Sequence, residues 1–183
     1  MAVPNDRGDV AVSGLAWHPT KPILAVAYRD GALKIWSPRE RRCAEDAVAH
    51  AGGKGVTACV WSAAVGQDGD STENFFALAT GDAAGHVAFW TVDRRARPEK
   101  IAELSLEKAL GDSHTARAVT HILAAPTGGP RRDAEVEKGF FRFLVGYARA
   151  DDKGGGSAMC AADVRNVPAP DAESARERRD KPG

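Results

Sequence analysis

The chain is poor in the features that mark several classes of protein. It has three cysteines in 183 residues, Cys43, Cys59 and Cys160, and they lie far apart. Because no Cys-x-x-Cys pair occurs, the sequence encodes neither a disulfide framework nor a zinc knuckle. So little cysteine favours a reducing, intracellular compartment.

Long apolar runs and an excess of charge of one sign are also missing. No stretch approaches the ~18 consecutive apolar residues of a membrane-spanning helix. Pro4, Asp6 and Arg7 stand where a signal peptide needs an apolar run. The 25 basic and 25 acidic residues balance, which removes a general attraction to nucleic acid or to anionic lipid. We therefore expect no direct membrane insertion and no nucleic-acid partner.

The sequence does contain an internal repeat. Residues 24–36, LAVAYRDGALKIW, align without a gap with residues 78–90, LATGDAAGHVAFW. Each segment follows a second shared element, VSGLAW at residues 12–17 and VTACVW at residues 56–61. Self-similarity of this kind is typical of folds that are assembled from copies of one structural unit.

Each copy predicts β-strands, because short apolar or alternating runs are bounded by turn residues. Asp30-Gly31 lies between two such runs and indicates a tight hairpin, since glycine tolerates a positive φ. We expect strands at residues 12–17, 23–28, 32–36, 56–61, 75–80 and 86–90, and a fourth strand per copy near residues 44–49 and 101–106.

A third, degraded copy follows, with expected strands at residues 119–123, 141–147 and 158–162 and no tryptophan at its end. Residues 98–118 and 125–139 are expected to hold inserted loops, with a short helix around residues 104–110. From residue 166 onward the chain is rich in proline and charge, which is typical of disorder. The expected organisation is a lead-in at 1–11, a repeat domain at 12–165 with units near 12–50, 56–106 and 119–165, and a disordered tail at 166–183.

The order LAWHPTKP, then LAVAYRDGALKIW, resembles a WD repeat, in which Trp-Ser/His-Pro precedes a segment containing Asp-Gly and ending in Trp-Asp. The resemblance implies an all-β fold, a partial WD-repeat β-propeller with two clear blades and a degenerate third. The signature positions of the repeat are Trp17, Asp30, Gly31, Trp36, Trp61, Asp82, Gly85 and Trp90.

The chain departs from the WD pattern at several positions. The aspartate that follows the last tryptophan is Ser37 in one copy and Thr91 in the other, and the usual Gly-His pair is Ala49-His50. The His–Asp–Ser/Thr–Trp hydrogen-bond network of strong WD repeats is therefore expected to be incomplete in this chain.

Over residues 12–125 the chain also resembles the N-terminal propeller of the largest WD-repeat subunit of intraflagellar transport complex A, through SGLAWHPTKPILAVAYRDGALKIW and FFALATGDAAGHVAFWTVDRRARP. The resemblance implies a subunit for retrograde ciliary transport and cilium assembly. It would be found at the cilium or flagellum, at the basal body and in the cytoplasm, with the other complex A subunits as partners. The alternative is a WD-repeat adaptor of a vesicle coat, trafficking or ubiquitin-ligase complex.

A propeller fragment predicts a protein-binding scaffold, not an enzyme. Propellers close with about 4–8 blades, so three units need further sequence or partners. Gly52-Gly53-Lys54-Gly55 lacks the spacing of a phosphate-binding loop. Asp112-Ser113-His114 has the residue types of a catalytic triad, but adjacency in sequence is not triad geometry. No cofactor, metal or small-molecule substrate is expected.

The four tryptophans recur at fixed strand positions, which favours packing in the core over anchoring of a partner. His18 follows Trp17 in a turn, and we expect it to be a structural hydrogen-bonding group. One arginine cluster follows the third strand in each of the two clear copies. Equivalent positions of a propeller fall on one rim. This possible partner-binding rim consists of Arg39, Arg41, Arg42, Arg94, Arg95 and Arg97, and the alternative is an ordinary solvated loop.

Overall fold

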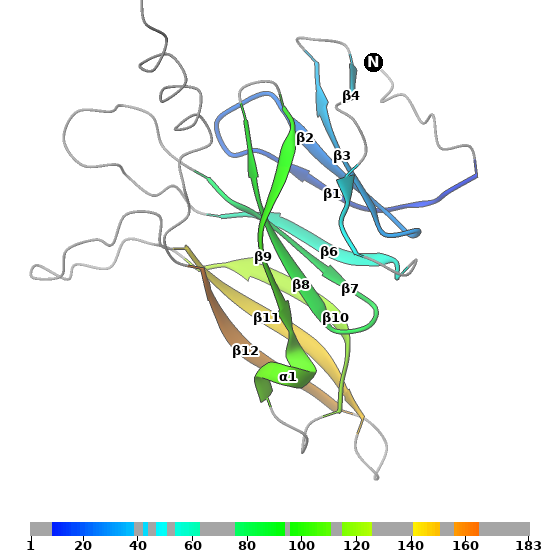
Figure 1. Cartoon of the computed structure of the whole chain (residues 1–183), viewed down its shortest axis with the longest axis vertical. Helices are drawn as coiled ribbons and strands as arrows, with labels where there is room; N and C mark the ends of the chain where they lie inside the picture. Colours follow the sequence, from blue (N-terminus) through cyan, green and yellow to red (C-terminus); the bar gives the residue numbers. More distant parts are fainter. Residues whose placement is uncertain are drawn as a thin grey trace, which may run out of the picture.

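The computed structural model describes residues 9–38, 42–43, 47–50, 54–62, 76–93, 96–110, 115–125, 141–150 and 156–164. These residues form three antiparallel sheets and one short helix, an all-β fold (Figure 1). The expected disordered tail at residues 166–183 and the expected loop at residues 126–139 lie outside the described part.

The first sheet contains β1 (Val12–Trp17), β2 (Leu24–Tyr28) and β3 (Ala32–Ser37), which pair in chain order. Beside β3, where a fourth strand is expected near residues 44–49, the described residues form β4 (Arg42–Cys43) and β5 (Ala47–Val48). β4 pairs with the end of β3 and β5 with its beginning, and residues 44–46 between them lie outside the described part.

The second sheet contains β6 (Val56–Trp61), β7 (Leu78–Asp82), β8 (His86–Val92) and β9 (Pro98–Ser105), again in chain order. The helix α1 (Leu106–Leu110) follows β9 directly. β7 begins three residues later than the expected strand, and most of the expected loop at 98–118 is β9 and α1.

The third sheet contains β10 (Thr115–Ala124), β11 (Phe141–Ala150) and β12 (Gly156–Val164). Although its sequence is degraded, β11 and β12 pair without interruption from Phe141↔Val164 to Arg149↔Gly156. A tryptophan at the end of a copy is therefore not needed to form the sheet.

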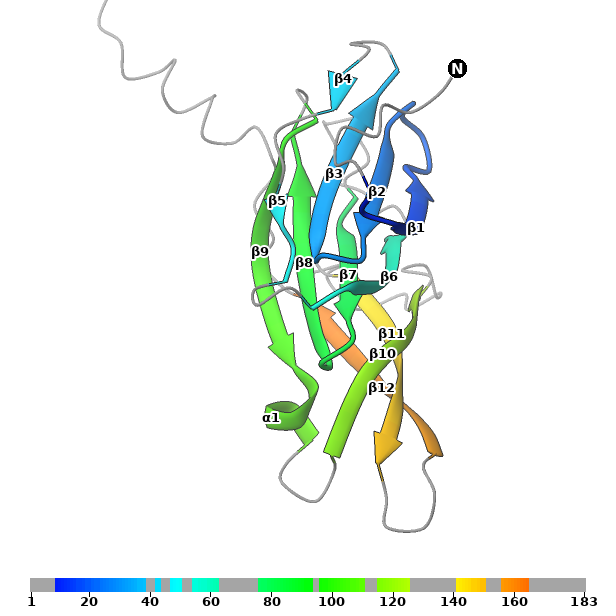
Figure 2. The same ribbon diagram turned by 90° about the vertical axis from the view of Figure 1, so that its right-hand side faces the viewer.

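The second sheet lies between the other two, as both views show (Figures 1 and 2). β6 contacts both β1 and β10, so the first strands of the three sheets are neighbours. Between the first and second sheets lies a buried cluster that includes Ala27, Ile35, Leu78, Ala88 and Trp90. A second cluster joins the second and third sheets and includes Ala79, Phe89, Val119, Phe143 and Val145.

Two hairpins carry glycine where the backbone requires it. Gly31 has φ 88° and Gly85 has φ 84°, and these glycines connect β2 to β3 and β7 to β8. The amide of Ala32 donates to Oδ1 of Asp30 at 3.1 Å, so Asp30 supports the first turn. In the second turn the carboxylate comes from Asp82, whose Oδ1 accepts from the amides of Ala84 and His86, both at 2.8 Å.

Candidate interaction surfaces

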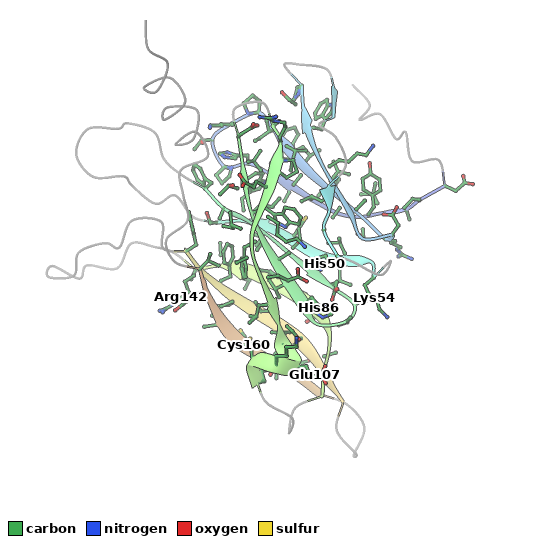
Figure 3. All side chains as sticks on the ribbon, in the orientation of Figure 1. His50, Lys54, His86, Glu107, Arg142 and Cys160 are labelled. Carbon is green, nitrogen blue, oxygen red and sulfur yellow. The ribbon has the colours of Figure 1, made fainter. Side chains whose placement is uncertain are left out.

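A buried polar network lies in the second sheet. Nε1 of Trp90 donates to Oγ1 of Thr80 at 3.0 Å, and Nε2 of His50 lies 3.2 Å from the same oxygen. Nδ1 of His50 lies 3.3 Å from Oδ2 of Asp82, although without hydrogen-bond alignment, and Asp82 also binds Nδ1 of His86 at 3.1 Å. Figure 3 labels the two histidines. In this sheet the His50–Thr80–Trp90 part of the set is formed, whereas the hydrogen bond between His50 and Asp82 is not.

The electrostatics of the network fit a neutral histidine. Burial lowers the pKa of His50, and the nearby carboxylate of Asp82 opposes the shift only in part. With its proton on Nε2, a neutral His50 donates to Thr80, whose hydroxyl in turn lies 3.5 Å from the carbonyl oxygen of Ala88. The arrangement orders the strands, because it joins residue 50 to β7 and β8.

The first sheet lacks this network. In the repeat alignment Val26 replaces Thr80 and Tyr28 replaces Asp82. Val26 and Tyr28 instead join Leu24, Ala32 and Trp36 in a buried apolar cluster on the side of β2 that faces away from the second sheet. For the first sheet, the expectation of an incomplete network is correct.

His18 connects the first and second sheets. Its Nδ1 accepts hydrogen bonds from the amides of Thr20 at 3.2 Å and Lys21 at 3.1 Å. Its ring packs against those of Trp61 and Phe76, with centroids 4.6 and 4.5 Å away. Burial, with a smaller contribution from Lys21, lowers the pKa of His18 to about 4. The imidazole is therefore a neutral structural group, as expected from its position in the turn.

The second and third sheets approach closely where the chain has Gly81. A Cβ at this position would lie 2.4 Å from Cγ1 of Val119 in β10. Beside it, Oγ1 of Thr57 is 3.1 Å from the carbonyl oxygen of Gly81 and 2.5 Å from that of Val119. The small residue and the bridging hydroxyl fix the distance between these two sheets.

The four tryptophans do not share one environment. Trp36, Trp61 and Trp90 are buried, and Nε1 of Trp61 donates to the carbonyl oxygen of Ala16 at 3.0 Å. Trp17 is 58% exposed, so the expectation of core packing is wrong for this residue. Its ring meets the ring of Trp36 edge-on, with the two ring centroids 6.3 Å apart.

Exposed large apolar side chains gather at the two ends of the series of sheets. Val12, Leu15 and Trp17 lie on β1 of the first sheet. Leu123 and Met159 lie on β10 and β12 of the third sheet, beside a cavity of 410 Å³ whose lining includes Thr120, Leu144 and Ala158. Sequence reasoning missed these residues, because the repeat pattern does not show which sheet lacks a neighbour.

A second cavity, of 390 Å³, separates β12 from β9 and α1. Its apolar lining includes Phe89, Leu104, Leu110, Cys160 and Ala162. In Figure 3, Cys160 lies between Arg142 and Glu107 of α1. Burial raises the pKa of the Cys160 thiol, so its sulfur contributes to the wall as an uncharged group.

Known proteins resemble the chain in sequence or in structure. Residues 1–64 match the family described as anaphase-promoting complex subunit 4 WD40 domain. Sqt1 of Saccharomyces cerevisiae is similar in structure, with 14% identity, a TM-score of 0.48 and coverage of 85% of this chain and 36% of its own. The WD40 domain of SCAP from fission yeast is also similar in structure, with 10% identity and a TM-score of 0.46. This match covers 83% of this chain and 32% of that one. No curated protein matches the chain in sequence.

The described residues form a partial, WD40-like propeller of three sheets, and the family match itself covers residues 1–64. The three sheets are its blades, and β1, β6 and β10 are their neighbouring first strands. The chain spans about a third of the length of each of the two solved chains.

The arginine rim is described only at one residue. Arg39, Arg41, Arg94 and Arg95 lie outside the described residues, and of Arg42 only the backbone in β4 is described. The side chain of Arg97 is 66% exposed and binds the carboxylate of Asp93 through Nε and Nη2, both at 2.8 Å. Arg97 thus closes the turn between β8 and β9 while it faces solvent.

Within the described ranges, no group of three or more His, Cys, Asp or Glu side chains is arranged to hold a metal ion. No helix in that part of the chain is long and apolar enough to span a membrane. Gly52 and Gly53 of the glycine-rich segment, and the whole of the Asp112-Ser113-His114 segment, lie outside the described residues.

Proposed function

We propose that the protein is a protein-binding scaffold. The observation that carries the proposal is the position of the exposed apolar side chains. Leu15 is 61% and Trp17 58% exposed on the outer face of the first blade, and Leu123 is 59% and Met159 66% exposed on that of the third. Neighbouring blades cover such faces in a closed propeller, and large exposed apolar patches mark protein interaction sites. Both ends of the series are therefore surfaces for protein, either further blades or a partner.

The assembly that we propose is intraflagellar transport complex A. The support is the motif resemblance over residues 12–125, in which the repeat elements and the sequence TVDRRARP stand in the same order. In this proposal the protein works in retrograde ciliary transport and cilium assembly, at the cilium or flagellum, at the basal body and in the cytoplasm. Its partners are the other complex A subunits, without nucleic acid, small-molecule substrate or direct membrane insertion.

The family match favours an alternative. Residues 1–64 are similar to the WD40 domain of an anaphase-promoting complex subunit, which is part of a different assembly. An adaptor of a ubiquitin-ligase, vesicle-coat or trafficking complex would use the same outer blade faces. The two proposals share the scaffold role and differ in the partners.

Affinity purification of the tagged, full-length protein from its source cells, with mass spectrometry of the bound proteins, tests both. Recovery of complex A subunits supports the ciliary proposal. Recovery of coat or ligase subunits supports the alternative and contradicts the ciliary one. A wild-type protein that recovers no specific partner contradicts the scaffold function itself.

Paired variants connect the result to the structure. Leu15→Ser with Trp17→Ser changes the outer face of the first blade, and Leu123→Ser with Met159→Ser changes that of the third. All four side chains are exposed, so each pair should cost less than about 1 kcal/mol of stability. Loss of partners from one pair identifies the end that binds them, and the other pair is its control. Unchanged recovery with both pairs would contradict the role given to the blade ends.

A further inference from the structure

The third blade ends at a strand edge where the second blade has a further strand. In the second blade, β8 pairs with β7 on one side and with β9 on the other. β12 holds the corresponding place in the third blade, and in the described part of the chain it pairs with β11 alone. A strand edge presents a row of backbone donors and acceptors that can pair with an added strand.

The 390 Å³ cavity borders the inner face of this edge. Along β12 the exposure alternates: Ala162 and Val164 are buried and Cys160 is partly buried, whereas Met159 and Asp163 face outward. Because side chains alternate along a strand, a strand placed beside β12 would direct every second side chain toward the cavity. There they would meet the apolar side chains of β9 and α1.

The segment that follows β12 lacks the pattern of such a strand. Residues 165–183 contain nine charged residues and three prolines, and Val167 is their only apolar residue larger than alanine. Proline and a high density of charge disfavour a paired strand. In the second blade, by contrast, the residues soon after β8 form β9 and place Ile101 and Leu104 against the core.

We propose that the edge of β12 binds an extended segment of a partner protein, which pairs antiparallel to β12 as the fourth strand of the third blade. The inference rests on the scaffold function proposed above and names one of its binding surfaces. Main-chain hydrogen bonds to β12 hold the segment, and the cavity selects its alternate side chains.

The cavity sets the chemistry of the partner segment. Phe89, Leu104 and Leu110 offer no partner for a charge, so the inward positions of the segment must be apolar. The carboxylates in the lining are already engaged, since Glu103 binds Lys100 at 3.0 Å and Asp163 binds Arg142 at 2.8 Å. The segment is therefore a strand with apolar side chains at every second position and polar side chains on its solvent face.

Selection of peptides of roughly ten residues from a random display library, with the whole chain as bait, tests the proposal. We expect the enriched peptides to show apolar residues at alternate positions. Synthetic copies of the most enriched peptide should bind Cys160→Glu at least about tenfold more weakly than wild type. Ser157→Glu is the matched control, because it places the same charge on an exposed residue of the same strand, β12, that does not line the cavity. It should change binding less than about twofold.

A second variant and a second readout guard against a folding defect. Leu110→Glu places a charge on the opposite wall of the cavity, on α1, and should weaken binding like Cys160→Glu. Both variants should keep a single cooperative thermal transition, at a lower temperature than the wild type because the charge lies beside apolar side chains. Hydrogen–deuterium exchange should show that the peptide slows exchange of β12 amides. Binding that is equal for the Cys160 and Ser157 variants, or selection without enrichment, overturns the proposal. So does an edge whose amides in the free protein already exchange as slowly as those of β8.

The outcome is separable from that of the scaffold function. If the edge is not a binding site, wild-type protein and Cys160→Glu recover the same partners in the affinity purification. If the scaffold function is wrong, wild-type protein recovers none.

Discussion

The indole nitrogen of Trp90 donates a hydrogen bond to the hydroxyl of Thr80 across 3.0 Å, in the buried centre of the second blade. The same hydroxyl lies 3.2 Å from Nε2 of His50. In the first blade the residue aligned with Thr80 is Val26, which packs in an apolar cluster with Trp36. Two blades with one repeat pattern thus hold their last tryptophan in different ways.

Removal of the Thr80 hydroxyl should expose this difference. Thr80→Val leaves the N–H groups of Trp90 and His50 without an acceptor in a buried place, so we expect a loss of about 1–3 kcal/mol in the free energy of unfolding. Thr80→Ser keeps the hydroxyl and removes one methyl group, for a cost near 0.8 kcal/mol. Denaturant titration followed by tryptophan fluorescence measures both. A valine variant as stable as the serine variant would contradict the role of the hydrogen bonds.

The sequence was sufficient to predict the strands and their order, because alternation and turn residues are local signals. Asp30-Gly31 predicted its hairpin, and the third sheet followed from apolar runs without a tryptophan. The outer strand of the first blade was predicted only near residues 44–49, and its pairing at Arg42–Cys43 was missed because the apolar pattern there is weak.

The buried network was missed for a different reason. Sequence reasoning examined the residues next to the usual signature positions, where Ser37 and Thr91 replace aspartate. The network instead joins His50 to Thr80, which are 30 residues apart and meet only when the blades pack. The exposure of Trp17 has a similar cause, since burial of a strand face depends on the neighbouring blade and not on the repeat itself.

The stability of the protein should depend on pH through two histidines. The folded-state pKa of His18 lies at about 4, below its ordinary value of 6.5, and burial lowers that of His50 as well. The unfolded chain therefore binds protons more readily than the folded chain. The contribution of the two neutral histidines to the free energy of unfolding is complete above about pH 6.5. It falls as the pH decreases toward 4, by about 2–3 kcal/mol for His18. Denaturant titrations between about pH 7 and about pH 4 would measure this slope.

His18→Asn is the control for that slope. An amide oxygen can accept from the backbone of Thr20 and Lys21 in place of Nδ1, and it does not titrate in this range. We expect the variant to lose stability less steeply with acidification than the wild type. An identical slope would show that protonation of His18 does not contribute to the acid response.

Gly81 should not accept a side chain. In Gly81→Ala the new Cβ would lie 2.4 Å from Cγ1 and 2.7 Å from Cβ of Val119, so β7 and β10 must separate. We expect a cost of about 1–3 kcal/mol in the free energy of unfolding. Val119→Ala in the same chain removes both γ-methyl groups and so relieves part of the clash, and the double variant should be more stable than the sum of the two single costs predicts. If the costs of the two single variants simply add in the double variant, the strain in Gly81→Ala does not come from its contact with Val119.

Substitution of the buried tryptophans should reduce stability, whereas substitution of the exposed one should reduce partner binding. Trp36→Ala or Trp90→Ala removes a buried ring, and each should cost about 3–5 kcal/mol. Trp17→Ala removes a ring that is 58% exposed and should cost less than about 1 kcal/mol, while it weakens recovery of partners. Thermal unfolding together with a pull-down measures both effects. A Trp17 variant as unstable as the Trp90 variant would contradict the exposed face of the first blade.

The arginine rim predicts a charge-dependent contact. Arg97 already binds Asp93 through two hydrogen bonds, so its reversal to Glu would break the β8–β9 turn as well as change the charge. Arg94→Glu with Arg95→Glu is the sharper test, and we expect it to weaken partner binding and to leave the thermal transition unchanged. Arg94→Lys with Arg95→Lys keeps the charge and is its control. Because screening weakens an exposed charged contact, added salt should reduce wild-type binding toward that of the Glu variant. Equal pull-down yields for the Glu and Lys variants would leave these arginines as an ordinary solvated turn.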